Sequence, residues 1–585
     1  MSISQKQLLS ALRERATLSY ANPPRLVLAF YYPWYGNPTH SGRWLHWEAV
    51  DTERKQIAAS THYPSLGAYD SNDPAAIDQH CRWAKQAGLD GFIVSWWGVD
   101  SVEEKPIPAL MNAAERHGLR VAFYYEQVPK PGDPESALND LLYLVERYTR
   151  HPASLTIGGR LVVFVYARAV EQLSLTQWAW VLAQVNRRTR SGICAIADRL
   201  SRTAGRIFDG IHTYNPVGRL YAKPVGKVRE ELNNLYQSAF QQVDPLLRIT
   251  CATVIPGYDD TKIRKPGLKV ERFGGELYRQ QWEAVLELMP DWVLITSFNE
   301  WHEGSEIEPS VEHGESYLTL TAEYAKRFRQ LGERPRIATP LTALGNRQLQ
   351  SLRRTWRNRP IALFPNPDSE ALHWLIQVGL TIEPLEMEEL IDPQKLQPQR
   401  LPLLVYAGGE SYPTRVRSEG DVDRALLAYL RAGGCLLALP SEPLPLYYDE
   451  NRRIVDGARR LGLPIASSSS NPIAGVSGFE RPPVPNLQFE FHRQHLPDMG
   501  TQPVPFPTGG DLRWRPLLRE GLGTGDEYIP LATLKEPNGR SWGEGAGVIR
   551  YRAGGTVGYV WFRLLDIPQA PILLHNLFHW LGRTL

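Results

Sequence analysis

Two glutamates three residues apart are the pair in this sequence best placed for acid–base chemistry. Glu300 and Glu303 directly follow an apolar run in the segment ITSFNEWHEGSEIEPS, residues 295–310. If the turn is helix-like, side chains at positions i and i+3 can face one cavity. Two carboxyl groups whose surroundings push their pKa values apart are the usual means of cleaving a glycosidic bond. The alternative is a solvated acidic turn, because Glu306 and Glu308 follow at once.

The sequence gives little support to metal or thiol chemistry. His302-Glu303 lacks the second histidine of an HExxH helix, so a zinc peptidase site is not expected. No ligand spacing supports another site built on His302. The cysteines are far apart and form no CxxC pair, which indicates buried reduced thiols; they are Cys81, Cys194, Cys251 and Cys435. We therefore expect no metal and no cofactor.

Apolar runs that could position these residues recur between residues 26 and 335. They cover 26–32, 91–97, 119–125, 160–166, 193–197, 208–214, 248–255 and 291–298. Most are continuous, as in parallel strands buried on both faces, and amphipathic helical stretches lie between them. One such stretch opens with Asp73 as N-cap and Pro74 at the first helical position. Eight β-then-α units predict a (β/α)8 TIM barrel over residues 25–340, with an open doubly wound sheet as the structural alternative.

Aromatic and polar side chains follow the ends of these predicted strands. A barrel would gather them at one mouth. They are Tyr32, Trp34, Tyr35, Trp96, Trp97, Glu126, Tyr166, Arg168, Asp198, Tyr214, Asn215, Tyr258, Asp259, Asn299, Glu300, His302 and Glu303, with His46 close to the first strand's end. Aromatic faces stack on sugar C–H surfaces, and carboxylates hold hydroxyl groups. This composition predicts a carbohydrate-binding site.

The rest of the chain has a different pattern. Residues 341–585 predict a smaller α/β layered domain, similar to flavodoxin-like or glutamine-amidotransferase-like domains. An active domain of the second kind would need a nucleophilic cysteine on a strand-to-helix elbow. Cys435 opens a strand instead, and Gly-Gly-Glu at 408–410 occupies the expected elbow, so we predict an inactive domain. Residues 465–510, rich in Pro, Ser and Gly, predict a long surface loop, and residues 1–24 an N-terminal extension.

Five segments together resemble one known family. They are YYPWYGNP (31–38), HYPSLGAYDSNDP (62–74), GLDGFIVSWWG (88–98), PGYDDTKIR (256–264) and SFNEWHEGSEIE (297–308). In this order they resemble glycoside hydrolase family 99, the endo-α-mannosidases, over roughly residues 26–333. The resemblance implies cleavage of internal α-mannosidic bonds with retention, through a 1,2-anhydro sugar and without a cofactor.

The resemblance also implies roles for single residues. Glu300 would be the general base that takes the proton of the sugar 2-OH, and Glu303 the general acid on the leaving oxygen. Trp97 would flank an outer donor-side subsite, and Tyr258 would lie near the reacting sugar. Weaker matches as hydroxyl binders are Glu126, Asn299, His46 and Tyr214, and we add Tyr32, Tyr35 and His302 from their place at the predicted mouth.

The charge and hydropathy of the sequence limit the classes of binding partner. Lys and Arg total 65 against 63 Asp and Glu, a net charge of +2 that favours neither nucleic acid nor an anionic membrane. No stretch approaches the roughly 18 apolar residues of a membrane span, and the N-terminal apolar run is too short for a signal peptide. We expect a cytoplasmic protein, with export by another route left open, that acts on an oligosaccharide or polysaccharide; homo-oligomers are also left open. The alternatives are a non-hydrolytic carbohydrate-binding or polysaccharide-assembly protein, and a hydrolase of another axial 2-OH glycoside.

Overall fold

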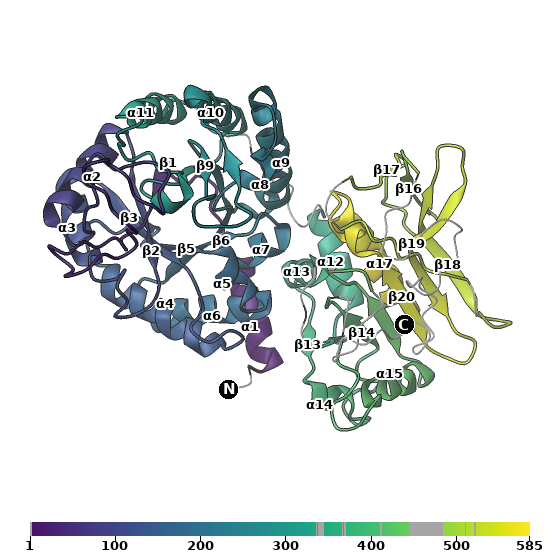
Figure 1. Ribbon diagram of the computed structural model, residues 1–585. Coiled ribbons are helices and arrows are strands. Elements are labelled where there is room, and N and C mark those ends of the chain that lie inside the picture. Colours follow the sequence, from purple (N-terminus) through teal and green to yellow (C-terminus); the bar gives the residue numbers. More distant parts are fainter. Residues whose placement is uncertain are drawn as a thin grey trace. The chain divides into compact units, whose positions relative to one another are not determined.

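The chain folds into two compact units, shown in Figure 1 as a computed structural model. One unit spans Thr17–Ala338, and the other joins Ser2–Ala16 to Thr339–Leu585. The structure describes residues 3–334, 336, 344–365, 367, 370–409, 412–444, 484–508, 511–519 and 522–585. Over these ranges, no helix is both long enough and apolar enough to cross a membrane.

Parallel strands close into a barrel in the first unit. They are β1 Leu26–Tyr31, β2 Gly91–Trp96, β3 Arg120–Tyr125, β5 Arg160–Val165, β6 Ile193–Asp198, β7 Gly210–His212, β8 Ile249–Val254 and β11 Trp292–Ile295. β1 pairs with β11 and β3 pairs with β5, so the ring of eight strands is closed. The prediction of a (β/α)8 TIM barrel is confirmed, and the open doubly wound sheet is excluded. Three short strands lie outside the ring: β4 Thr156–Ile157, β9 Tyr258–Asp259 and β10 Lys269–Val270.

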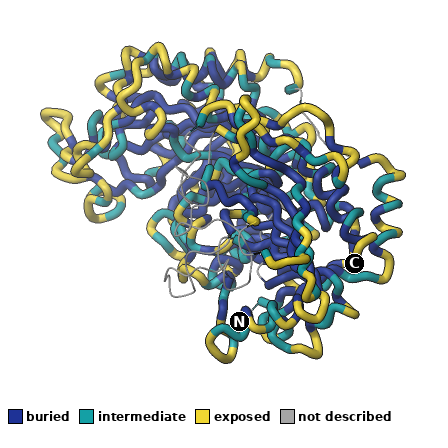
Figure 2. The backbone as a smooth tube through the Cα atoms, turned by 90° about the vertical axis from the view of Figure 1, so that its right-hand side faces the viewer, coloured by how far each residue is buried: buried dark blue, intermediate teal, exposed yellow. Residues whose placement is uncertain are grey.

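The barrel strands are buried on both faces, which explains their continuous apolar sequences. Every residue of β2, β6, β8 and β11 is buried. Aromatic side chains fill part of the interior: the Phe30 ring lies 4.8 Å from that of Tyr124 and 6.3 Å from that of Phe164. In Figure 2 the buried stretches of the backbone lie inside and the exposed turns at the surface.

Helices follow the barrel strands along the chain. They are α2 Pro74–Gln86, α3 Ile107–His117, α4 Pro134–Tyr148, α5 Ala167–Glu171, α6 Leu175–Arg188, α7 Arg202–Ile207, α8 Val217–Leu220, α9 Val228–Val243, α10 Glu276–Leu288 and α11 Ser316–Arg329. Short 3-10 turns are η1 Val225–Lys227, η2 Asp244–Leu246, η3 Phe273–Gly275 and η4 Trp301–Glu303. α2 begins as expected, because the Asp73 side chain accepts the Ala75 N–H at 2.9 Å and Pro74 takes the first position.

The second unit is built on one mixed sheet. Its parallel strands are, in order, β13 Ile382–Pro384, β12 Ile361–Leu363, β14 Leu403–Tyr406, β15 Cys435–Ala438 and β20 Thr556–Val560. Antiparallel strands extend it through β19 Ser541–Arg550, β18 Glu527–Lys535, β16 Gln488–Phe491 and β17 Val504–Pro505. Its helices are α1 Gln5–Ala16, α12 Asn346–Thr355, α13 Glu370–Val378, α14 Met387–Leu390, α15 Asp421–Arg431 and α17 Ala570–Thr584, with a 3-10 turn η5 Phe562–Leu565. A second, sheet-containing α/β domain is therefore present, and its amidotransferase likeness stays a prediction.

The N-terminal helix is part of this second unit rather than a separate extension. Leu9 of α1 is buried in the core of the unit. The Gln5 backbone N–H donates to Glu386 Oε1 at 2.7 Å. The apolar face of α1 is thus covered by residues more than 300 positions away, which local sequence patterns do not show.

Two further predictions concern this unit. Part of the loop predicted at 465–510 is strand, because the alternation QFEF in β16 buries Phe489 and Phe491; residues 445–483, 509 and 510 lie outside the described residues. Cys435 opens β15 as expected, and burial raises the pKa of its thiol to about 12, which argues against a nucleophile. Glu410 of the expected elbow also lies outside the described residues.

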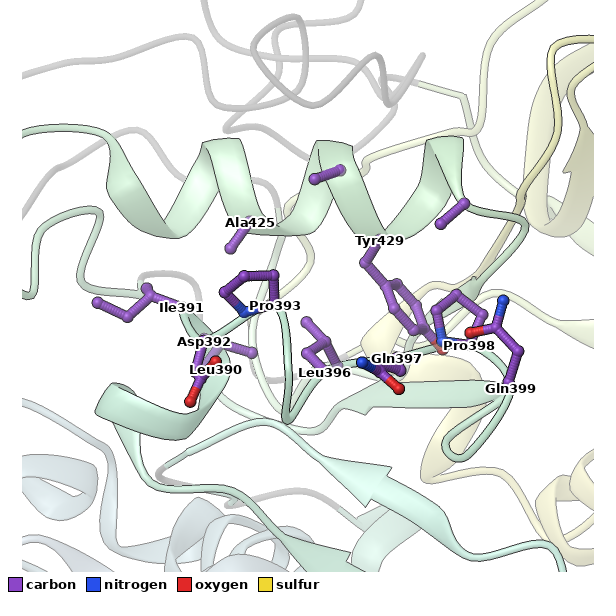
Figure 3. A pocket seen from close by; sticks show the side chains of 12 residues that line it. Leu390, Ile391, Asp392, Pro393, Leu396, Gln397, Pro398, Gln399, Ala425 and Tyr429 are labelled. Atoms are coloured by element: carbon purple, nitrogen blue, oxygen red, sulfur yellow. The ribbon is translucent and has the colours of Figure 1, made fainter.

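A pocket of about 290 Å³ lies in the second unit between α15 and residues 390–399 (Figure 3). Leu396 and Ala425 contribute apolar surface to its walls. The Tyr429 hydroxyl donates to the Leu401 carbonyl at 2.7 Å. Apart from Asp392 the lining is uncharged, so the pocket gives no indication of the ligand it would take.

Candidate active site

The turn after β11 places both predicted catalytic glutamates at the C-terminal end of a barrel strand. A cis peptide joins Thr296 to Ser297 just beyond the strand. Ser297 Oγ accepts the Glu300 backbone N–H at 2.7 Å, which ties the turn to the strand end. Glu303 is the last residue of η4, and Gly304 ends that turn at φ +55°, a conformation that favours glycine.

Glu300 is buried and engaged through one oxygen. Its side chain is only 4% exposed. Oε1 accepts the His302 backbone N–H at 3.2 Å and lies 3.1 Å from ring Nδ1 of the same histidine. No bond from another described residue reaches Oε2, so this oxygen is available to a substrate proton.

Glu303 has more hydrogen-bond partners and a weaker acidity. Its Oε2 accepts the Tyr214 hydroxyl at 3.2 Å, and Oε1 accepts the Tyr258 hydroxyl at 3.2 Å. Both terminal nitrogens of Arg264 donate to Oε1 at 3.3 Å. Burial first, and then the charge of Glu300, raise the pKa of Glu303 to about 7, while Arg264 opposes the shift. Such a carboxyl group can hold a proton near neutral pH and give it to a leaving group.

A third carboxyl group belongs to the same electrostatic cluster. Glu126 follows β3, is buried, and accepts the Ser95 hydroxyl at 2.7 Å. Burial first, and less strongly the charges of Glu300 and Glu303, raise the pKa of Glu126 to about 8, while the Ser95 hydrogen bond and the charge of Arg168 oppose the shift. A neutral Glu126 can both donate to and accept from a sugar hydroxyl, in keeping with its expected role.

Trp97 is held at the end of β2. Its Nε1 donates to Ser95 Oγ at 3.0 Å, so Ser95 joins Trp97 to Glu126. The guanidinium carbon of Arg168 lies 5.1 Å from the Trp97 ring centre, which indicates a cation–π contact. The indole is half-buried.

The loop after β1 supplies a stack of rings. Trp34 lies between Tyr32 and His46, with both ring-centre separations at 4.6 Å, and is parallel to His46 within 5°. The Tyr32 hydroxyl donates to that of Tyr214 at 2.7 Å, which links this stack to Glu303. His46 is exposed, and its carbonyl oxygen accepts His302 Nε2–H at 2.7 Å.

Tyr35 and Asn299, which we predict to bind substrate, both form hydrogen bonds with the backbone. Both are buried. The Tyr35 hydroxyl donates to the Asn299 carbonyl and accepts the Trp301 N–H, each at 3.1 Å. The Asn299 amide bonds both the N–H and the carbonyl of Tyr32, at 2.7 and 3.0 Å. They position the glutamate turn against the first strand.

The solvated acidic turn considered above is wrong, because Glu306 and Glu308 are buried. Glu308 Oε2 accepts Trp301 Nε1–H at 3.0 Å and the Tyr69 hydroxyl at 2.9 Å, and Oε1 lies 3.1 Å from His80 Nε2. Glu306 pairs at 2.7 Å with both Arg272 and His62. Except for Trp301, these partners come from other segments of the barrel unit, and they fix the position of the turn.

Sequence reasoning also missed Arg264. Its NH1 bonds Asp260 Oδ2 at 2.5 Å and the Tyr258 hydroxyl at 2.6 Å, besides Glu303. The segment PGYDDTKIR was singled out in the sequence, but only the structure shows that its last residue, Arg264, contacts Glu303. An arginine four residues after a buried aspartate was the available signal. Across the described ranges, no group of three or more His, Cys, Asp or Glu side chains is arranged to hold a metal ion.

A closed (β/α)8 barrel that carries two largely buried carboxyl groups beyond one strand end, one of them with a raised pKa, has the site of a glycoside hydrolase. The family model described as glycosyl hydrolase family 99 matches residues 24–327, more than half of the chain. The chain belongs to this family and is a glycosidase.

Individual relatives match the same part of the chain. The chain is 30% identical over 353 residues to glycoprotein endo-alpha-1,2-mannosidase of Mus musculus, covering 51% of this chain and 74% of that protein. It is 29% identical over 326 residues to the protein of the same description from Xenopus laevis, covering 49% and 71%. Among solved structures, the GH99 endo-alpha-mannosidase from Bacteroides thetaiotaomicron is 27% identical, with 53% of this chain and 98% of that chain covered and a TM-score of 0.45.

Proposed function

We propose that this chain is a retaining, endo-acting α-mannosidase that cleaves internal α-mannosidic bonds of a glycan or polysaccharide. The observation that carries the proposal is the contrast within one turn. Glu303 has a pKa raised to about 7, whereas Glu300 contacts a histidine and keeps one oxygen available. Family membership and the activities in the relatives' descriptions support the substrate class.

The proposed first step uses both glutamates at once. Glu300 takes the proton of the mannose 2-OH, and the freed oxygen attacks C1 from the face opposite the leaving group. Glu303 gives its proton to the departing glycosidic oxygen, so the C1–O bond breaks as the 1,2-anhydro ring closes. A nucleophile within the same sugar has the high effective molarity of a held reactant.

The proposed second step restores the enzyme. Glu303, now ionised, takes a proton from water, and the hydroxide oxygen attacks C1. The C1–O2 bond opens and Glu300 returns its proton to O2. Each step inverts C1, so the net result is retention.

The mechanism selects its sugar. In an α-mannoside the axial 2-oxygen lies trans to the leaving group and is aligned for back-side attack. The equatorial 2-oxygen of a glucoside lacks this alignment. Another glycoside with an axial 2-OH is the substrate that this chemistry would also accept, and Glu126 and Trp97 are the proposed contacts to neighbouring sugar units.

The test is incubation of the chain with α-mannan fragments and with glucosyl- and mannosyl-α-1,3-mannosyl substrates. We expect internal cleavage with release of oligosaccharides. Reducing-end analysis of the products identifies the sugar at which the bond is cut. If the chain binds these sugars and leaves all of them intact, it is a carbohydrate-binding protein and the proposal is wrong.

Arg264→Gln is expected to move the alkaline limb of kcat/KM to higher pH. The Arg264 charge lowers the pKa of Glu303, so without it the acid stays protonated to higher pH. We expect a shift of roughly half a unit to one unit, because the arginine side chain is 52% exposed and water screens it. pH–rate profiles measure the shift, and Arg229→Gln, at an exposed ion pair with Glu287, is the matched control. An unmoved limb would show that Arg264 does not set the acidity of Glu303.

Trp97→Ala is expected to raise KM roughly tenfold, since the stacking face of an aromatic ring contributes about 1–1.5 kcal/mol. kcat should change less, because Trp97 is proposed to hold a sugar away from the reacting bond. Trp97→Phe keeps a flat face and should retain most of the affinity. Steady-state kinetics on an oligosaccharide measure both constants. An unchanged KM in Trp97→Ala would remove Trp97 from the site.

A further inference from the structure

His302 has an acceptor oxygen at each of its two ring nitrogens. Nε2 lies 2.7 Å from the backbone carbonyl oxygen of His46. Nδ1 lies 3.1 Å from Oε1 of Glu300. The ring is largely buried, with 13% of the side chain exposed. The imidazole was predicted to bind sugar, but both nitrogens are engaged by the protein itself.

A neutral imidazole cannot satisfy both oxygens, because it carries a single N–H. With the proton on Nε2, the lone pair of Nδ1 would face an ionised carboxylate. With the proton on Nδ1, the lone pair of Nε2 would face the His46 carbonyl. Only two forms make both bonds: an imidazolium beside ionised Glu300, or a neutral ring that accepts a proton from Glu300. The second form leaves Glu300 without basic character.

We propose that His302 is a positioning residue that stays an imidazolium and keeps Glu300 ionised while Glu303 carries the catalytic proton. The inference rests on the proposed function, since it assigns the base of that reaction its charge. His302 thereby acts through Glu300 and does not touch the substrate.

The groups around His302 favour its charge. Burial alone would lower the pKa of His302, but the hydrogen bond and charge of Glu300, the His46 carbonyl and the charge of Glu48 outweigh it and raise the pKa. The His46 and Tyr35 rings have their centres 5.7 Å from the centre of the His302 ring, and the Trp34 ring has its centre at 6.1 Å. His46 is itself titratable, and burial first, then the charge of His302, lower its pKa to about 4, so His46 adds no second positive charge near neutral pH.

The contact explains why neighbouring carboxyl groups differ. Glu126, Glu300 and Glu303 are buried within electrostatic reach of one another, so they cannot all be ionised at little cost. A cation in hydrogen-bond contact with one member directs the negative charge to that member. Arg264 also contacts Glu303, at 3.3 Å, but it pairs more closely with Asp260 at 2.5 Å and is 52% exposed, so its charge is shared and screened. His302 lies 3.1 Å from Glu300 and is only 13% exposed, so the negative charge goes to Glu300.

The kinetic test compares pH profiles of kcat/KM for the wild type and His302→Gln. Glutamine is neutral, so Glu300 should need a higher pH to ionise. We expect the acid limb to move up by about one pH unit, which lowers kcat/KM roughly tenfold at any pH below the limb. His117→Gln is the matched control, because His117, the last residue of α3, also pairs with a carboxylate, Asp78 at 2.9 Å. A uniform loss across pH with an unmoved acid limb would overturn the proposal.

A second measurement does not depend on activity. The chain has 14 histidines, and 15N labelling of their rings with NMR would show how many nitrogens of each carry a proton. The His302 signals are assigned by their loss in His302→Gln. We expect protons on both His302 nitrogens near neutral pH, whether or not any mannoside is cleaved. An unprotonated Nδ1 would overturn the inference, whereas an inert wild type with a doubly protonated His302 would overturn the proposed function alone.

Discussion

Replacing Glu303 with glutamine is expected to lower kcat/KM on α-mannosides roughly 10²–10⁴-fold, the range of a lost general acid. Glutamine keeps the size of the side chain and can still accept the hydroxyls of Tyr214 and Tyr258, but it cannot donate a proton to the leaving oxygen. Because the pKa of Glu303 is raised to about 7, the side chain can still carry this proton near neutral pH.

Substrates with different leaving groups show whether Glu303→Gln has lost proton donation. A mannosyl fluoride substrate expels fluoride without general acid help, so Glu303→Gln should keep most of the first step on it. The second step then lacks its base, and added azide, which needs no deprotonation, should restore turnover. Glu230→Gln, at an exposed ion pair with Lys227, is the control and should behave as the wild type. Equal loss on both kinds of substrate would contradict the role of Glu303.

Replacing Glu300 with glutamine should cost as much, roughly 10²–10⁴-fold, but on every leaving group. Without this base the 2-OH keeps its proton and the intramolecular nucleophile is not formed. Neither a fluoride leaving group nor azide supplies the missing step. The backbone N–H of His302 can still bond a glutamine oxygen, so the turn should keep its shape.

Rate measurements on both substrates, with and without azide, separate the two glutamates. Thermal unfolding of each variant checks that the fold is intact. If azide or a good leaving group rescues Glu300→Gln, then Glu300 is not the base that frees the 2-oxygen. In that case the two roles must be exchanged or the mechanism replaced.

The barrel was predictable because the local sequence of each strand is enough to indicate it. Continuous apolar runs such as 91–97 and 193–197 are buried on both faces, and the capping residues Asp73 and Pro74 mark a helix start. The second unit was harder, because β16 and β17 are short and lie next to a Pro- and Ser-rich stretch. Its N-terminal helix packs against α13 and β13, which come more than 300 residues later in the chain.

The positions of the two glutamates were predictable from the sequence, and the contacts that surround them were less so. Glu300 and Glu303 lie at the end of β11, as their spacing and neighbours predict. The sequence could not show that Glu308 accepts a hydrogen bond from the Trp301 indole, because this contact depends on the exact shape of the turn. It also could not show that the Tyr35 hydroxyl bonds the backbone of the turn, because this contact joins segments more than 200 residues apart. The pKa of a side chain also depends on contacts that the sequence does not show. Arg264 lowers the pKa of Glu303 because its guanidinium lies 3.3 Å from that carboxylate.

The most direct test of the central claim follows the configuration of the first product. The wild-type chain is mixed with a mannosyl-α-1,3-mannosyl substrate, and the anomeric proton of the released sugar is observed by NMR before mutarotation. The account predicts internal cleavage in which the α-anomer appears first. A β-anomer formed first, or the removal of single terminal sugars only, would contradict it.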